Sequence, residues 1–206
     1  MPDPKTYSPE TLKEQGLGTM RAVICDLDGV FFKLLNHFGE YGVSARLPNE
    51  VATEEGLGEV LDELVTLGFK IIGVTNQPDI SRGKSTPEFL SWKHAQLLKM
   101  YPQFSRVFPC THTEADLCSC RKPKAGLLRQ AGKQFGLDFA ESWMIGDSRA
   151  DVEAGMMVGA RTILIQTKWN CGNPAIDKAT AVATSTKGAL KLIALVKSGE
   201  KNHGDA

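Results

Sequence analysis

The sequence predicts an α/β fold, a Rossmann-like three-layer α/β/α domain on a mostly parallel sheet. Three observations support this. Short apolar runs of strand length alternate with segments of helical periodicity along most of the 206 residues. Several of the helical segments end at a Gly or just before a Pro, as helices commonly do. The composition, 42% hydrophobic and 23% charged, is that of an ordinary globular protein. Strands that alternate with helices usually form a parallel sheet covered on both faces.

The first half of the chain contains two predicted strands and one predicted helix between them. The run MRAVIC at 20–25 is apolar and ends at Asp26, so it is expected to be a buried strand. Helical spacing of Leu57, Val60 and the apolar residues after them predicts a helix that Thr53 caps and that ends before Gly68. A second strand follows at 69–74 (FKIIGV). Residues 29–50 carry no pattern that assigns them.

The second half continues the alternation. Thr86-Pro87 opens a helix, because Thr is a good cap and Pro suits the first helical position, and this helix is expected to end near 101–102. Strands are predicted at 106–109, 143–146 and 161–166. Helices are predicted at 124–135, at 149–158 and, with an amphipathic pattern, at 186–197, and residues 168–185 are expected to form a loop.

The domain organisation follows from these elements. Residues 20–198 are expected to form one domain, preceded by a loose lead-in at 1–19 and followed by a flexible tail at 199–206. The stretches from Asp28 to Thr75 and from Asn76 to Lys122 are largely used by helix and strand, so no separate cap domain is expected.

Charge and hydropathy argue against several classes of partner. Lys plus Arg and Asp plus Glu both number 24, whereas nucleic-acid binders usually carry a basic excess. No apolar run approaches the ~20 residues of a membrane span, and the N-terminus is polar. We therefore expect a cytoplasmic monomer that binds neither nucleic acid nor membrane.

Polar side chains follow four of the predicted strands. Because ligands of such folds gather at the carboxyl ends of the strands, these side chains are expected to converge on one rim. They comprise Asp26 and Asp28, Thr75 and Asn76, Arg121 and Lys122, and Asp147 with Asp151 four residues later. Carboxylates, a hydroxyl, an amide and cations in one place suit phosphoryl transfer, because a divalent cation and positive side chains must neutralise the phosphoryl group.

Each carboxylate has an expected role. Asp26 would attack phosphorus and form an aspartyl-phosphate. Asp28 would protonate the leaving alkoxide and later deprotonate water. Mg²⁺ prefers oxygen ligands, which Asp26 and Asp147 supply, and Asp151 would orient the ion or its waters. Thr75 and Asn76 would bind phosphate oxygens, and Lys122 would add a positive charge.

Taken singly, these motifs have ordinary structural explanations. Asp26-Leu-Asp28-Gly29 resembles a turn or a calcium-like loop, and Asp147 could cap a helix. Their recurrence after successive strands favours an active site.

A second cluster contains three cysteines and a histidine, Cys110, His112, Cys118 and Cys120. In a reducing compartment, four such ligands suit a closed tetrahedral zinc site in a loop at 110–120; the alternative is a loop of free thiols. The cluster would set Arg121 and Lys122 in position. His94, among polar residues of a predicted helix, is expected at the surface.

These motifs resemble those of a known superfamily. Four segments look like the ordered motifs of haloacid dehalogenase-like (HAD-like) phosphatases, namely DLDGV at 26–30, TNQ at 75–77, Lys122-Pro123 and GDSRAD at 146–151. The resemblance implies that Asp26 is the nucleophile and Asp28 the general acid/base. It also implies that Mg²⁺ is held by Asp26, the backbone carbonyl of Asp28, and Asp147.

The zinc cluster narrows the resemblance. VTNQPDISRG at 74–83 and CSCRKPK at 118–124 are similar to signatures of a zinc-containing subgroup, the D-glycero-D-manno-heptose 1,7-bisphosphate 7-phosphatases and the histidinol-phosphate phosphatases. The resemblance implies that Thr75, Asn76, Gln77, Arg121 and Lys122 bind substrate.

The expected function is thus that of a phosphoric monoester hydrolase acting on a small phosphorylated metabolite, such as a sugar phosphate or bisphosphate. Three alternatives remain: a histidinol-phosphate phosphatase, a phosphotransferase or mutase on the same fold, and a non-enzymatic, zinc-stabilised binding domain.

Overall fold

The computed structural model describes residues 20–37, 40–167, 170 and 176–204. Six strands form one parallel sheet in the order β5-β4-β1-β6-β7-β8. In chain order they are β1 (Arg21–Cys25), β4 (Phe69–Asn76), β5 (Phe104–Cys110), β6 (Trp143–Gly146), β7 (Arg161–Ile165) and β8 (Ala181–Ala183). The predicted fold class is confirmed, and the five predicted strands are present.

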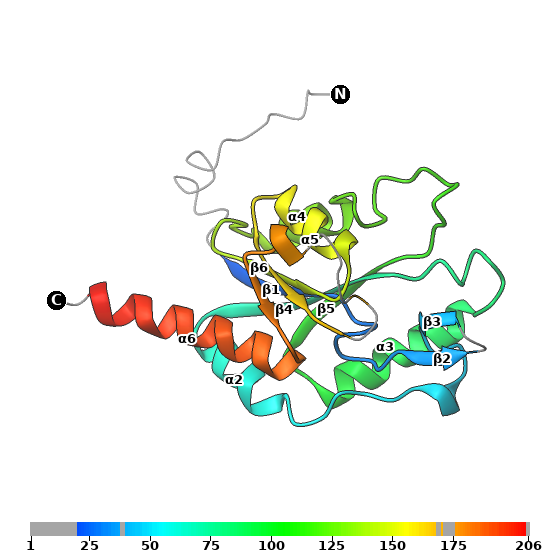
Figure 1. The fold of residues 1–206 in the computed structure, drawn as a ribbon, viewed down its shortest axis with the longest axis horizontal. Helices are drawn as coiled ribbons and strands as arrows, with labels where there is room; N and C mark the ends of the chain where they lie inside the picture. Colours follow the sequence, from blue (N-terminus) through cyan, green and yellow to red (C-terminus); the bar gives the residue numbers. More distant parts are fainter. Residues whose placement is uncertain (1–19, 38–39, 168–169, 171–175, 205–206) are drawn as a thin grey trace.

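Helices cover both faces of the sheet, as Figure 1 shows. They are α2 (Gly58–Thr66), α3 (Pro87–Met100), α4 (Gly126–Phe135), α5 (Arg149–Met156) and α6 (Thr186–Gly204). Alternate residues of β1 point to opposite faces, as the period of a strand requires. Val23 and Cys25 join the core packed against α2 and α6. Ala22 and Ile24 join the core packed against α4. This arrangement gives three layers.

The predicted helix ends are partly confirmed. Thr86 caps α3, since its Oγ1 accepts a hydrogen bond from the Phe89 amide at 3.1 Å. Gly136 closes α4 in the left-handed conformation, with φ 63°. The expected start at Thr53 is wrong, because Thr53 pairs with Phe32 in an isolated bridge and α2 begins only after Gly56, whose φ is 69°.

α6 continues beyond the expected end at 197 as far as Gly204, so most of the predicted tail lies in this helix. Residues 205–206 and the predicted lead-in at 1–19 lie outside the described residues.

Two segments contain structure that the sequence did not reveal. Residues 29–50 include an antiparallel hairpin of β2 (Leu35–His37) and β3 (Glu40–Val43), followed by the short 3₁₀ helix η1 (Pro48–Glu50). Arg46, just after the hairpin, forms an ion pair with Asp79 in the loop after β4 (Nε–Oδ2 2.7 Å). The second segment is 168–185. The expectation of a loop is wrong at β8, which pairs in parallel with β7 from Ala181 to Ala183.

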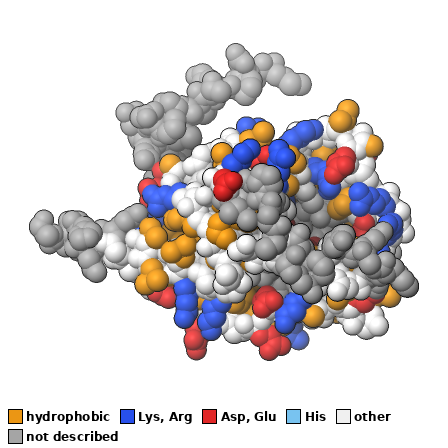
Figure 2. Space-filling view, in the orientation of Figure 1, with side chains coloured by type: hydrophobic (Ala, Val, Ile, Leu, Met, Phe, Trp, Pro, Cys, Tyr) orange, Lys and Arg blue, Asp and Glu red, His pale blue; other side chains and the backbone are white. Residues whose placement is uncertain are grey.

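The surface has mixed character. On the face in Figure 2, basic and acidic side chains are interspersed, and apolar side chains gather over the region of α6. Leu195 of α6 is 70% exposed. None of the described helices combines the length and apolar character that crossing a membrane requires.

Candidate active site

The site lies at the carboxyl end of β1, which has β4 as its neighbour on one side and β6 on the other. Cys25, the last residue of β1, is in register with Gly73 of β4 and Ile145 of β6. Chain segments after these three strands therefore meet at one edge of the sheet, as ligand sites of parallel sheets do. The predicted convergence of Asp26, Thr75 and Asp147 follows from this order.

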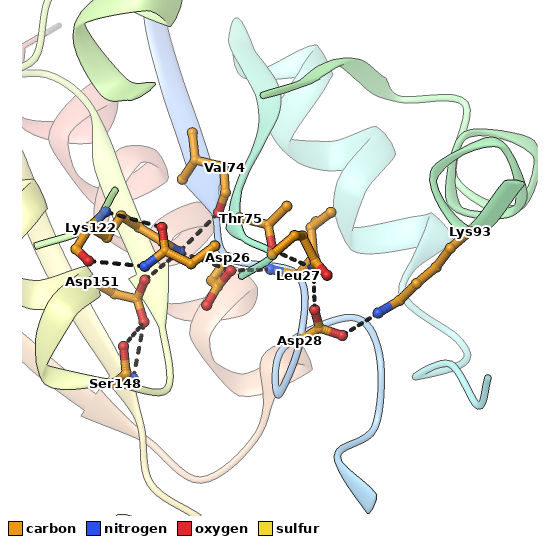
Figure 3. Close-up of polar contacts among 11 residues, drawn as sticks. Asp26, Leu27, Asp28, Val74, Thr75, Lys93, Lys122, Ser148 and Asp151 are labelled. Carbon is orange, nitrogen blue, oxygen red and sulfur yellow. Dashed lines mark hydrogen bonds and ion pairs between the residues drawn. The ribbon is translucent and has the colours of Figure 1, made fainter. Parts of the chain in front are cut away.

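Lys122 joins the carboxylates of the site, as Figure 3 shows. Its Nζ lies 2.8 Å from Asp26 Oδ1 and 2.6 Å from Asp151 Oδ1, and it donates to the Val74 carbonyl at 2.9 Å. The Lys122 side chain is only 2% exposed. Burial alone would lower the pKa of this ammonium, but Asp151 and Asp26 raise it above its ordinary value. Lys122 is therefore a permanent cation inside the site.

The carboxylates of Asp26 and Asp151 contact the Lys122 ammonium, and that of Asp147 lies beside them. Oxygen atoms of Asp26, Asp147 and Asp151 all lie within 4.8 Å of one another. Burial raises the pKa of Asp26 to about 7 against the opposing effect of Lys122, and burial with the charges of Asp26 and Asp151 raises the pKa of Asp147 to about 8. One ammonium cannot balance three carboxylates, and a divalent cation with oxygen ligands would supply the missing positive charge. The residues present fit Mg²⁺.

Gly29 makes room for the Asp147 carboxylate. A Cβ at this position would lie 2.0 Å from Asp147 Oδ2, and the φ of Gly29 is 82°. Both the close approach and the left-handed backbone require glycine here. On the other side, Asn170 donates from Nδ2 to the Asp147 carbonyl at 2.7 Å. No motif in the sequence marks Asn170, so it was not among the predicted site residues.

Asp151 is 1% exposed and has both oxygens occupied. Oδ1 faces Lys122, and Oδ2 accepts from the Ser148 amide at 3.0 Å, which completes a capping box at the start of α5. Asp151 was expected to orient a metal ion or its waters; in the structure its direct partner is Lys122.

Asp28 points away from the other carboxylates, toward α3. Its Oδ2 accepts from Gln77 Nε2 at 2.6 Å, and its Oδ1 forms an ion pair with Lys93 Nζ. Gln77 Nε2 also donates to Thr75 Oγ1 at 3.0 Å. Lys93 belongs to none of the motifs, but its position is a signal: it occupies the buried stripe of Leu90 and Leu97, where a lysine is unusual.

Asn76 uses its side-chain amide to hold the backbone of Lys122. Nδ2 donates to the Lys122 carbonyl at 2.9 Å, and Oδ1 accepts from the Lys122 amide at 3.0 Å. The pair links the loop after β4 to the segment after the cysteine cluster, 46 residues further along the chain.

The cysteine cluster is gathered as predicted. The ligand atoms of Cys110, His112, Cys118 and Cys120 lie within 4.8 Å of one another. Sγ of Cys120 lies 3.3 Å from Cys110 Sγ and 3.4 Å from Cys118 Sγ, and the Cys110–Cys118 distance is 3.8 Å. A tetrahedral zinc ion with Zn–S bonds of about 2.3 Å places two sulfurs about 3.8 Å apart. The spacing is close to what a metal ion needs.

Arg121 follows the cluster directly, and a cavity of about 180 Å³ lies beside it. The cavity is lined by Thr113, Glu114, Leu117, Cys118 and residues 121–124. The Arg121 guanidinium donates to the His112 carbonyl and forms an ion pair with Glu114, both at 3.4 Å. Lys124 donates to the carbonyls of Leu117 and Cys118.

His94 is not the surface residue that the sequence predicted. It is partly buried, and its Nε2 is buried without a hydrogen-bond partner in the part of the chain that the structure describes. Burial, with the charge of Lys93, lowers its pKa to about 4. The polar neighbours in sequence misled the prediction, because α3 turns this position toward the protein.

Comparison with known proteins supports the same grouping. A family model described as HAD-hydrolase-like matches residues 119–186. A D-glycero-beta-D-manno-heptose-1,7-bisphosphate 7-phosphatase of Neisseria meningitidis serogroup A is 30% identical over 152 residues, covering 72% of this chain and 78% of the relative. An enzyme of the same name from Pseudomonas aeruginosa is 34% identical over 113 residues, covering 53% of this chain and 64% of the relative.

A solved structure gives the same fold. The D,D-heptose 1,7-bisphosphate phosphatase of B. bronchiseptica, crystallised with magnesium and phosphate, superposes with a TM-score of 0.72 at 23% identity, covering 87% of this chain and 99% of that one. The sequence identity to the Neisseria relative is consistent with the sheet order and with the carboxylates gathered at one edge of the sheet. The chain belongs to the family of the D-glycero-beta-D-manno-heptose-1,7-bisphosphate 7-phosphatases, which are HAD-like phosphatases.

Proposed function

We propose that this protein hydrolyses the phosphomonoester of a small phosphorylated sugar, with a heptose 1,7-bisphosphate as the first candidate, through an aspartyl-phosphate on Asp26. The observation that carries the proposal is the convergence of Asp26, Asp147 and Asp151, of which Asp26 and Asp151 pair with the buried ammonium of Lys122. Relatives named for this substrate support the substrate class.

A magnesium ion would be held by Asp26, Asp147 and the backbone carbonyl of Asp28, and when bound it would supply the positive charge that lets a carboxylate approach a phosphoryl group. Asp26 Oδ1 is held by Leu27 and Lys122, which leaves the second oxygen to attack. The new Asp26–phosphorus bond forms as the bond from phosphorus to the sugar oxygen breaks. Lys122 offsets charge on the transferred group.

Asp28 handles the protons in this proposal. In the first step it protonates the departing sugar oxygen, and in the second it takes a proton from the water that hydrolyses the aspartyl-phosphate. Thr75 and Gln77 lie beside Asp28. We assign Thr75 to binding the phosphate and Gln77 to holding the Asp28 carboxylate. Asn76, whose amide is engaged with Lys122, is assigned to positioning that lysine.

Substrate recognition is assigned to the cavity beside Arg121. A group carrying a second phosphate would find the Arg121 guanidinium there, adjoining the transferred phosphate at Lys122. We further propose that a structural zinc ion is held by Cys110, His112, Cys118 and Cys120. This ion would fix the side of the cavity that Cys118 and Arg121 line. Metal analysis of the purified protein tests it: one zinc per chain is expected, and a protein free of zinc with reactive thiols contradicts it.

The decisive experiment is phosphate release from a panel of sugar phosphates, sugar bisphosphates and histidinol phosphate, with and without Mg²⁺. We expect Mg²⁺-dependent release, fastest with a bisphosphate, and loss of activity in Asp26→Asn with the fold retained. A wild-type protein inactive on the whole panel overturns the proposal. The histidinol-phosphate and phosphotransferase alternatives are not favoured by the relatives, and the panel and an acceptor other than water would reveal either.

A further inference from the structure

We propose that Lys93 is a positioning residue of this reaction, which holds the Asp28 carboxylate where it exchanges protons with the leaving group and with water. The inference rests on the proposed function and adds to it a residue that belongs to none of the motifs. Figure 3 shows Asp28 between the catalytic cluster and the Lys93 side chain that reaches in from α3.

Lys93 is buried in a way that only its partners explain. The residue is 1% exposed, its Nζ forms an ion pair with Asp28 Oδ1, and the ammonium lies 4.5 Å from the centre of the Phe32 ring. Taking an ammonium out of water is unfavourable unless an anion or an aromatic face compensates it. Both compensating groups come from the segment directly after β1, which carries the nucleophile.

The Asp28 carboxylate is fixed from two directions. Lys93, from α3, contacts Oδ1, and Gln77, from the loop after β4, donates to Oδ2 at 2.6 Å. Two donors on two oxygens leave the carboxyl group little freedom to rotate. Without Lys93, Gln77 would be the one side-chain donor left to the Asp28 carboxylate among the described residues. A general acid/base must lie within hydrogen-bond reach of the proton that it transfers.

A purely structural role explains Lys93 less well. Leu90 and Leu97 occupy the same buried stripe of α3, and a third apolar residue would pack there without bringing in a charge. Buried ion pairs contribute little net stability compared with apolar residues of similar volume. The lysine is accounted for by what it does to Asp28.

The test is Lys93→Met, which keeps an unbranched side chain of nearly the same length and removes its charge and donors. Lys99→Met, an exposed lysine of the same helix, is the matched control. With a sugar phosphate, we expect kcat to fall about 100-fold with KM changed less than about threefold, because Asp28 acts in the chemical steps and proton transfer contributes about 10²–10⁴-fold. The control should match the wild type.

A second readout separates positioning from loss of structure. With p-nitrophenyl phosphate, the leaving group needs no proton, but hydrolysis of the aspartyl-phosphate still needs Asp28. Lys93→Met should therefore release about one equivalent of nitrophenolate per active site in a burst, followed by slow turnover. A merely structural defect would lower the rate without producing a burst.

The double variant Asp28→Asn/Lys93→Met tests whether Lys93 acts through Asp28. Because it removes both charges of the buried ion pair, it also serves if Lys93→Met alone does not fold. If Lys93 acts through Asp28, the double variant should be as active as Asp28→Asn. A Lys93→Met enzyme with wild-type kcat, or losses that multiply in the double variant, overturns the inference. These outcomes are distinct from failure of the proposed function, in which the wild type itself releases no phosphate.

Discussion

Replacing Asp147 by Asn should stabilise the magnesium-free protein at alkaline pH. Asp147 shares a site with Asp26 and Asp151, and Lys122 is the one ammonium within contact distance of the cluster in the described part of the chain. Burial and these neighbours raise the Asp147 pKa from 3.8 to about 8. Asn has the same shape and removes the charge.

The magnitude follows from linkage between protonation and folding. The folded state holds a proton on Asp147 that the unfolded state loses near pH 4, so stability falls as pH rises from about 4 to about 8. A pKa raised this far corresponds to about 6 kcal/mol at most, and because Asp147 is partly exposed, solvent screening reduces it to about 2–3 kcal/mol. The Asn variant should recover that amount at pH 8 and little at pH 5.

The assay is urea unfolding of wild type and Asp147→Asn at pH 5 and pH 8. Mg²⁺ is removed with chelating resin and without EDTA, which would also strip a metal from the cysteine cluster. Asp177→Asn, at an exposed position, controls for the loss of one charge. Adding Mg²⁺ should stabilise the wild type at pH 8 and leave Asp147→Asn unchanged. A variant no more stable than the wild type at pH 8 would refute the electrostatic reasoning.

Three further predictions follow. Gly29→Ala should abolish Mg²⁺-dependent activity, because its Cβ would lie 2.0 Å from Asp147 Oδ2; Gly83→Ala, with a left-handed φ but open space around it, should lose only about 1–2 kcal/mol in unfolding experiments and keep its activity. Cys118→Ser should lower the zinc content measured by atomic emission and lower the melting temperature, and equal zinc in variant and wild type would contradict the ligand assignment. The wild type should lose stability as pH falls from about 6.5 to about 4, because the unfolded state binds a proton that the buried His94 imidazole does not, and His94→Leu should flatten this loss. Between pH 7 and pH 4.5 the free energy of unfolding should fall by about 2 kcal/mol more in the wild type than in the variant, and parallel pH profiles would disprove the prediction.

The parts of the fold that rest on local patterns could be predicted from the sequence. β1, β4, β6 and β7 are apolar runs long enough to be read as strands, and Thr86-Pro87 and Gly136 mark helix ends through capping chemistry that depends on neighbouring residues alone. The short β8 and the paired strands β2 and β3 were not predictable, because three or four residues are too few to show a strand pattern and each strand is held by its partner.

The candidate site divides in the same way. The sequence by itself determined which residue types follow each strand, and hence that Asp26, Thr75, Lys122 and Asp147 would share one rim and that three cysteines and a histidine would share a loop. Strand order and residue type suffice for that, since parallel strands bring their carboxyl ends together.

Only the tertiary structure decided which of these groups contact one another. It paired Asp151 with Lys122, turned Asn76 to the Lys122 backbone, and placed Lys93 of α3 against Asp28. Such pairings depend on how a helix rotates and packs over the sheet, which is set by the whole core, so a lysine in an apolar stripe becomes part of the site only when the fold is complete.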